Sequence, residues 1–111
     1  MTTPLFRYEL DKNGRPAAHV AGDTHAGLAG FLTEEASWAD YVDLLLDAVA
    51  KAARSGKPQV TTGNAWAVTV DGAEAVIEHL HKKGHPRITV PLAVFTRALR
   101  EWRAFLVKAA P

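Results

Sequence analysis

The spacing of the apolar residues constrains the fold of this chain more than any other feature, because it changes between a period of two and the period of a helix. Residues 5–10 alternate between apolar and charged side chains, which predicts a half-buried strand. The apolar side of this strand consists of Phe6, Tyr8 and Leu10. Asn13-Gly14 accepts the positive φ angles of a tight hairpin turn, so residues 17–21 are predicted to return as the second strand.

A second alternating region lies in the middle of the chain. Residues 59–62 are predicted to form a strand that is interrupted at Gly63-Asn64. Trp66, Val68 and Val70 then share one face of the next strand. A turn at Asp71-Gly72 leads into a further strand over residues 74–80. The register stays open, since a slip of one residue would exchange the two faces.

Two segments show helical spacing instead. In the first, Ser37 opens a predicted capping box with Asp40, and Gly56 with Pro58 ends the helix. Its predicted apolar stripe is Trp38, Tyr41, Leu45, Val49 and Ala52. Both Trp38 and Trp66 are therefore assigned to the core rather than to a binding surface.

The second helix is predicted near the end of the chain, with Thr89 as its cap and Pro91 in its first turn. Its predicted apolar stripe is Leu92, Phe95, Leu99, Trp102 and Leu106. Three arginines, Arg97, Arg100 and Arg103, fall on the opposite side.

Residues 23–36 fit neither period, because Gly27 and Gly30 interrupt both, and we expect a loop or an irregular strand there. The whole pattern predicts one α+β domain over residues 1–111. Two hairpins or a meander would form a single sheet, antiparallel or mixed, with two amphipathic helices packed on it in the order ββ-α-βββ-α.

Composition indicates an ordinary globular protein, with 48% hydrophobic and 23% charged residues in 111. The chain has no cysteine, which fits a reducing compartment. Its first residues contain no apolar signal region, and no uncharged apolar run approaches the roughly 20 residues of a membrane-spanning helix. We therefore expect a soluble cytoplasmic protein that makes no membrane contact.

The sequence contains no recognisable catalytic or cofactor motif. Ser37 and Ser55 are the only serines, and neither lies in a nucleophile elbow. The glycines of residues 26–30 lack the lysine of a phosphate-binding loop and the spacing of a dinucleotide fingerprint. We expect neither an enzyme nor a cofactor or small-molecule substrate.

The histidines offer only a weak metal pattern. His79, His81 and His85 have metal-like spacing, but lysines rather than carboxylates lie among them. We therefore predict solvated loop histidines and no metal site.

The charges are distributed very unevenly along the chain, although the formal net charge is only +1. Residues 16–50 contain six carboxylates and no lysine or arginine. Residues 79–108 contain seven basic side chains and only one carboxylate, Glu101. A one-signed surface of this kind favours a binding function and determines which partners are attracted.

The acidic segment predicts a surface for a basic protein, such as a nuclease whose positive groove normally holds phosphates. The candidate contact residues are Asp23, Glu34, Glu35, Asp40, Asp43 and Asp47. The last three recur at helical spacing on the face opposite the apolar stripe.

The basic half supports an alternative, namely a nucleic-acid-binding or ribosome-associated protein. Its contacts would be Lys82, Lys83, Arg87, Arg97, Arg100 and Arg103. The acidic half would repel the same polyanion, and the three helical arginines are equally explained as a solvated helix face. Direct nucleic-acid binding is therefore the second choice.

Several segments also resemble a known group of proteins. The matching segments are residues 6–10, 30–35, 44–48, 55–57, 62–65 and 91–106, the last of which ends in the block Phe95 to Leu106 with Trp102 inside it. Together they resemble the small bacterial immunity proteins of contact-dependent growth inhibition systems and the related YacL-like proteins. The resemblance implies an α+β fold and a non-catalytic role, in which the protein neutralises one cognate toxin domain, typically a nuclease, by binding it.

Overall fold

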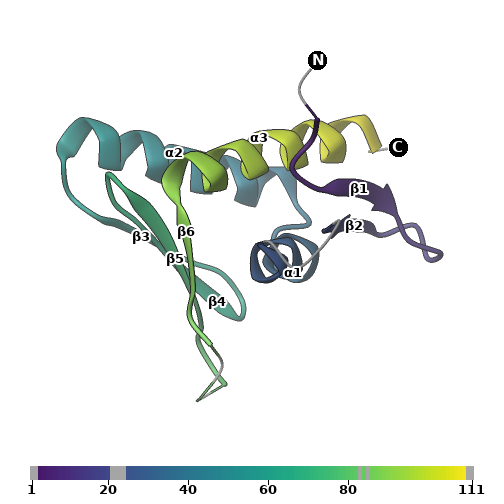
Figure 1. The fold of residues 1–111 in the computed structure, drawn as a ribbon, viewed down its shortest axis with the longest axis horizontal. Coiled ribbons are helices and arrows are strands. Elements are labelled where there is room, and N and C mark those ends of the chain that lie inside the picture. The colour runs from purple at the N-terminus through teal and green to yellow at the C-terminus, as the bar shows by residue number, and fades with distance from the viewer. Residues whose placement is uncertain (1–2, 21–24, 83, 85, 110–111) are drawn as a thin grey trace.

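The computed structural model in Figure 1 describes residues 3–20, 25–82, 84 and 86–109. The fold is α+β, as predicted, but the described residues form three helices and two separate antiparallel sheets. The elements are β1 (Arg7–Leu10), β2 (Pro16–His19), α1 (Ala26–Glu34), α2 (Ala39–Ser55), β3 (Gln59–Thr62), β4 (Trp66–Val70), β5 (Glu74–His79), β6 (Ile88–Pro91) and α3 (Leu92–Ala109).

The prediction of a single sheet is wrong, because helix α1 separates the two groups of strands. β1 and β2 form a two-stranded hairpin in which Tyr8 lies opposite Ala18. The other four strands form a meander in the order β3-β4-β5-β6. Helix α1 contacts β2 on one side and β6 on the other, so the hairpin cannot extend the larger sheet (Figure 1).

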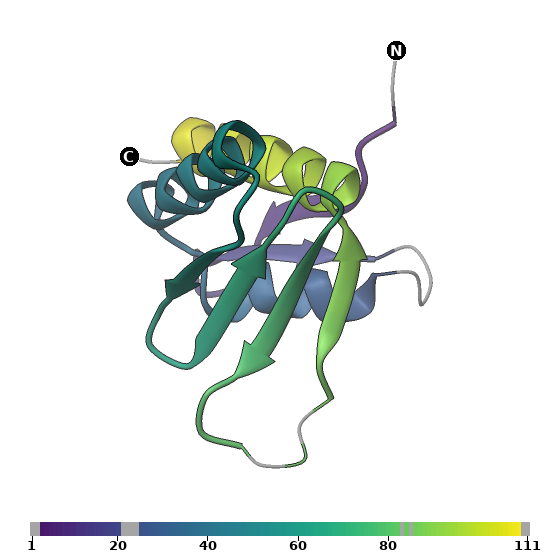
Figure 2. The same cartoon turned by 90° about the vertical axis from the view of Figure 1, so that its left-hand side faces the viewer.

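The larger sheet has one covered face and one open face. Trp66, Val68 and Val70 of β4 point into the core, which confirms the predicted alternation. Their neighbours Ala67 and Thr69 point to the opposite face, which no helix covers in the described part of the chain (Figure 2). Helix α1 therefore lies between the covered face and the small hairpin, and α2 and α3 lie across the top of the view in Figure 1.

Residues 26–34 form a helix, so the prediction of a loop or irregular strand at residues 23–36 is wrong for this part. Leu28, Ala29, Phe31 and Leu32 are buried on one side of α1. A Cβ atom on Gly27 would lie 2.9 Å from Ile88 Cγ1, so this glycine allows α1 to lie close to β6. Tertiary packing of this apolar face outweighs the low helix propensity of glycine.

Helices α2 and α3 lie side by side and run in opposite directions (Figure 1). Gly56 ends α2 with a left-handed φ of 69°, as its position in the sequence predicted. The predicted capping box is wrong, because Trp38 occupies the N-cap position and makes no side-chain cap hydrogen bond. In α3, Phe95, Leu99, Trp102 and Leu106 are buried as predicted.

The predicted start of the last helix is also wrong. Thr89 and Pro91 belong to strand β6, where Thr89 lies opposite Val76 and Pro91 lies opposite Glu74. The backbone N–H of Leu92 still donates to the Ala73 carbonyl at 2.9 Å, so the strand continues directly into the helix. No separate capping loop is needed at this junction.

Trp102 lies at the centre of the helical layer and is fully buried. Its indole Nε1–H donates to the Ala36 carbonyl at 2.6 Å, in the short connection between α1 and α2. Its ring lies 5.9 Å from that of Tyr8 and 5.8 Å from that of Phe105. A single side chain thus joins α3 to the hairpin and to the α1–α2 connection.

Glu101 fastens the N-terminal segment to α3. Its Oε1 accepts from the Leu5 N–H at 2.8 Å and from the Tyr8 hydroxyl at 2.6 Å. Its Oε2 accepts from Arg97 Nε at 3.0 Å. Partial burial disfavours the charged carboxylate, but these three donors outweigh burial, and the pKa of Glu101 is lowered.

We expect Glu101→Gln to destabilise the protein at pH 7 by about 1.5–3 kcal/mol, the range for hydrogen bonds to a charged group. Because folding lowers the pKa of Glu101 below its usual 4.5, its contribution is complete above that value. The contribution is lost as the pH falls through the folded-state pKa. Urea unfolding at pH 7 and pH 3 should therefore show a difference between wild type and variant that shrinks at the lower pH.

The matched control is Glu74→Gln, which changes an exposed carboxylate on β5. Its effect should stay within about 0.5 kcal/mol at both pH values. A Glu101 variant with a pH-independent deficit would contradict a role for the charged carboxylate.

Candidate functional site

The structure separates the six acidic residues that the sequence grouped together. Asp23 lies outside the described residues. Glu34 and Glu35 lie at the end of α1, whereas Asp40, Asp43 and Asp47 lie along the first half of α2. Two of the five described carboxylates have intramolecular partners, which changes what they can contribute to binding.

Glu35 holds the loop between β3 and β4. Its Oε1 accepts from the backbone N–H of Asn64, and its Oε2 accepts from that of Ala65 at 3.2 Å. A Cβ atom on Gly63 would collide with the Glu35 carboxylate, so the absence of a side chain at this position makes room for it. The neighbouring Tyr41 has a pKa raised to about 12, first by burial and then by Glu35. Glu35 is therefore a structural residue.

Asp43 forms an ion pair with Arg103 across the α2–α3 contact. Arg103 donates from Nε to Asp43 Oδ1 and from Nη2 to Oδ2, the latter at 3.3 Å. The hydrogen bond from Arg103 lowers the pKa of Asp43. Because both side chains are almost half exposed, solvent screens the pair and it contributes little to stability. Its main effect is to neutralise one of the predicted contact residues.

Glu34, Asp40 and Asp47 are exposed, and none of them forms an ion pair with another described residue. Glu34 and Asp40 lie on either side of Trp38 in the sequence. Asp47 lies farther along α2 and faces strand β3. The acidic surface is thus smaller than the sequence indicated, and it is divided between two places.

Trp38 lies on the surface, so its assignment to the core is wrong. Its side chain is 72% exposed, whereas Trp66 is buried as predicted. The reason is the backbone, because Trp38 has extended angles (φ −115°, ψ 129°) and precedes the first helical residue of α2. Its side chain therefore does not follow the stripe of Val42, Leu45 and Ala48.

Trp38 belongs to an exposed apolar surface that three parts of the chain build together. Leu10 at the end of β1, Trp38 before α2 and Val107 near the end of α3 line one depression of about 440 Å³. We call these three residues the Trp38 patch. Leu10 was predicted on the buried side of its strand, but the strand ends there and the residue is 48% exposed.

The surface beside the Trp38 patch is polar and carries charges of both signs. A second depression of about 700 Å³ lies beside Trp38 and is lined by Asp11, Arg15 and Glu34 among others. Asp40 follows two residues after Trp38. An exposed tryptophan with apolar neighbours and a charged rim has the anatomy of a protein-binding surface. Sequence reasoning missed this site, because nothing in the spacing distinguishes Trp38 from a core residue.

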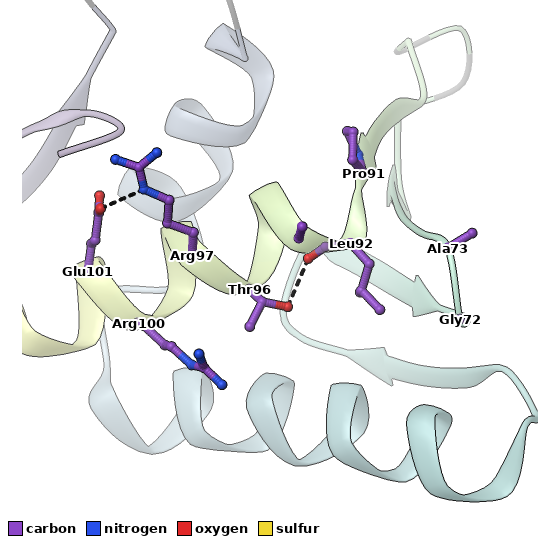
Figure 3. A pocket seen from close by; sticks show the side chains of 9 residues that line it. Gly72, Ala73, Pro91, Leu92, Thr96, Arg97, Arg100 and Glu101 are labelled. Atoms are coloured by element: carbon purple, nitrogen blue, oxygen red, sulfur yellow. Dashed lines mark hydrogen bonds and ion pairs between the residues drawn. The ribbon is translucent and has the colours of Figure 1, made fainter. Parts of the chain in front are cut away.

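Three of the five described basic residues of the alternative function are also paired with carboxylates, the other two being Lys82 and Arg100. Arg87 bonds Glu78 at 3.4 Å, and Arg103 bonds Asp43. Arg97 donates to both Glu101 and the Thr3 carbonyl. Figure 3 shows the depression of about 650 Å³ at the start of α3, in which Arg97 is directed toward Glu101 and Arg100 extends away from that pair. Lys83 lies outside the described residues.

The histidines take structural positions where they are described. His79 Nδ1 accepts from the backbone N–H groups of His81 and Lys82, each at 3.1 Å. His85 lies outside the described residues. Within the described part of the chain, no group of three or more histidines and carboxylates is placed to hold a metal ion.

No helix among the described residues combines the length and the apolar character needed to cross a membrane. Neither a family model, nor a curated protein, nor a solved structure matches this chain.

We expect Glu35→Ala to lower the free energy of unfolding by about 1–3 kcal/mol, because the backbone N–H groups of Asn64 and Ala65 lose their acceptor. The matched control is its neighbour Glu34→Ala, which should change stability by no more than about 0.5 kcal/mol. Urea unfolding followed by tryptophan fluorescence measures both. Equal stability of the two variants would contradict the structural role of Glu35.

Proposed function

We propose that this chain is an immunity-type inhibitor that binds a cognate nuclease toxin domain and covers its basic active site or substrate groove. The observation that carries the proposal is the exposed Trp38 in an apolar patch with carboxylates on its rim. The resemblance of the sequence to growth-inhibition immunity proteins points in the same direction. The protein would act in the cytoplasm, where its lack of cysteine is suitable.

In the proposed surface, the apolar side chains and the carboxylates would have different roles in binding. Tryptophan is the side chain that most often dominates the energy of a protein interface, provided that its surroundings become dry on binding. Leu10 and Val107 would supply the apolar surroundings. Glu34 and Asp40 would attract a positively charged groove and orient the approach, which affects the association rate more than the final affinity.

This proposal replaces part of the acidic surface expected from the sequence. Glu35 and Asp43 already have intramolecular partners, so they would act only indirectly. The nucleic-acid alternative has less support, since Arg87, Arg97 and Arg103 are all paired with carboxylates. A polyanion would have to compete with those carboxylates for each guanidinium.

The first test uses the purified C-terminal domain encoded by the gene directly upstream of this one. Wild-type protein should bind this domain, inhibit its nuclease activity and protect cells that co-express it. Trp38→Ala should weaken binding roughly 30-fold, as removal of an interface hot spot of about 2 kcal/mol does. Isothermal titration calorimetry measures the affinity.

The control for this test is Leu80→Ala, an exposed apolar residue that lines neither depression beside Trp38. Both variants should keep their stability within about 0.5 kcal/mol. A wild-type chain that neither binds nor inhibits the upstream domain, but binds nonspecific RNA with steep salt dependence, would overturn the proposal in favour of the alternative.

The second test concerns the carboxylates Glu34 and Asp40. The double variant Glu34→Gln and Asp40→Asn should slow association with the same domain at low salt, and the difference from wild type should disappear at about 1 M salt. Stopped-flow fluorescence measures the rate. Glu74→Gln, an exposed carboxylate on another surface, should leave the rate unchanged. Identical rates for all three proteins would remove Glu34 and Asp40 from the interface.

A further inference from the structure

Strand β3 is an edge of the larger sheet, and its outer side is unpaired within the described residues. β3 bonds only to β4, with Thr61 opposite Val68. The Gly63 N–H donates to the Trp66 carbonyl at 2.9 Å, so these two residues are a hydrogen-bonded pair of the antiparallel ladder between β3 and β4. Because hydrogen-bonded and non-bonded pairs alternate, the backbone N–H and C=O groups of Val60 and Thr62 point away from β4. Figure 2 shows β3 at the free side of the sheet.

This edge lacks most of the features that usually prevent strands from pairing with another chain. Natural edge strands are protected by short length, charged side chains, prolines, bulges or covering segments. β3 is short, with four residues, but it contains no charged residue, no proline and no bulge. β3 consists of Gln59, Val60, Thr61 and Thr62, and its register with β4 is regular. Val60 is 65% exposed, although valine strongly favours paired strands.

Helix α2 lies beside this edge. Leu44, Asp47, Ala48 and Lys51 line a depression of about 320 Å³ together with all four residues of β3. Leu44 is exposed on α2, whereas the Val60 side chain lies on the open face of the sheet, on the same side as its β4 partner Thr69. A strand added to β3 would therefore meet both free backbone groups and a side-chain surface from α2.

We propose that the occupant of this groove is a second copy of the chain, which pairs its own β3 in the antiparallel direction. A twofold axis at Thr61 would place Val60 of one copy opposite Thr62 of the other, so the same outward groups satisfy one another. The two four-stranded sheets would become one continuous sheet. This axis is perpendicular to the sheet, so both α2 helices would lie on the same face and run in opposite directions.

The charges of the groove favour a second copy over other occupants. Asp47 and Lys51 lie one helical turn apart and are the two charged residues that line the depression. In the twofold arrangement, Asp47 of one copy would face Lys51 of the other, and the reverse pair would form as well. A self-complementary surface with no net charge suits an isologous contact and gives no attraction to a strongly basic partner.

The first experiment measures the oligomeric state of the full chain without any partner protein, by sedimentation velocity over a range of concentrations. Wild type should approach twice the monomer mass. Val60→Pro removes an N–H that points away from β4, so it should weaken dimerisation roughly tenfold or more while keeping the ladder to β4. Val60→Thr keeps this N–H and should dimerise like wild type. A wild-type chain that stays monomeric at roughly 1 mM would overturn the proposal.

A charge exchange makes the test independent of any damage to the strand. Asp47→Lys and Lys51→Asp should each dimerise roughly tenfold more weakly than wild type, because like charges then face each other. An equimolar mixture of these two variants should form a heterodimer, which native mass spectrometry detects. Unchanged dimerisation of both single variants, or the absence of a heterodimer in the mixture, would overturn the arrangement. Because the experiment contains no toxin, its outcome is separate from that of the proposed inhibitory function.

Discussion

The buried hydrogen bond from Trp102 to the Ala36 carbonyl determines how the parts of this molecule are joined. It ties α3 to the connection between α1 and α2, and the same indole packs against Tyr8 of the hairpin. Because Ala36 is held inside, the chain must leave α1 in a fixed direction. Trp38, two residues later, is then placed on the surface before α2 begins. The core tryptophan therefore positions the exposed one.

Part of the uneven charge distribution along the sequence is explained by contacts within the molecule, where acidic and basic side chains lie next to each other. Helices α2 and α3 lie side by side in opposite directions, which brings an acidic helix next to a basic one (Figure 1). Asp43 pairs with Arg103, and Asp40 adds a weaker attraction to the same guanidinium. A run of like charges along a sequence thus overestimates the charged surface that a partner meets. The carboxylates left for a partner are those at the ends of this contact.

Most strands and both long helices could be predicted from periodicity, because their packing faces repeat regularly. Helix α1 could not be predicted in this way, since Gly27 has a low helix propensity. Its lack of a side chain instead allows the close approach of Ile88. Strand β6 could not be predicted for a similar reason. Thr89 and Pro91 are typical of the start of a helix, but they pair with β5. The position of Trp38 depends on a single extended residue. Each miss reflects a tertiary contact that local sequence does not encode.

The two surfaces proposed for binding lie at different places along α2 and do not exclude each other. The Trp38 patch precedes the first turn of the helix, whereas the groove beside β3 begins at Leu44. A helix rises about 1.5 Å per residue, so Lys51 lies roughly 20 Å from Trp38 along the axis. In the twofold arrangement the two copies meet beside β3, while the Trp38 patches would remain at the outer ends of the antiparallel α2 helices. Such a dimer would leave both of the surfaces proposed for toxin binding free.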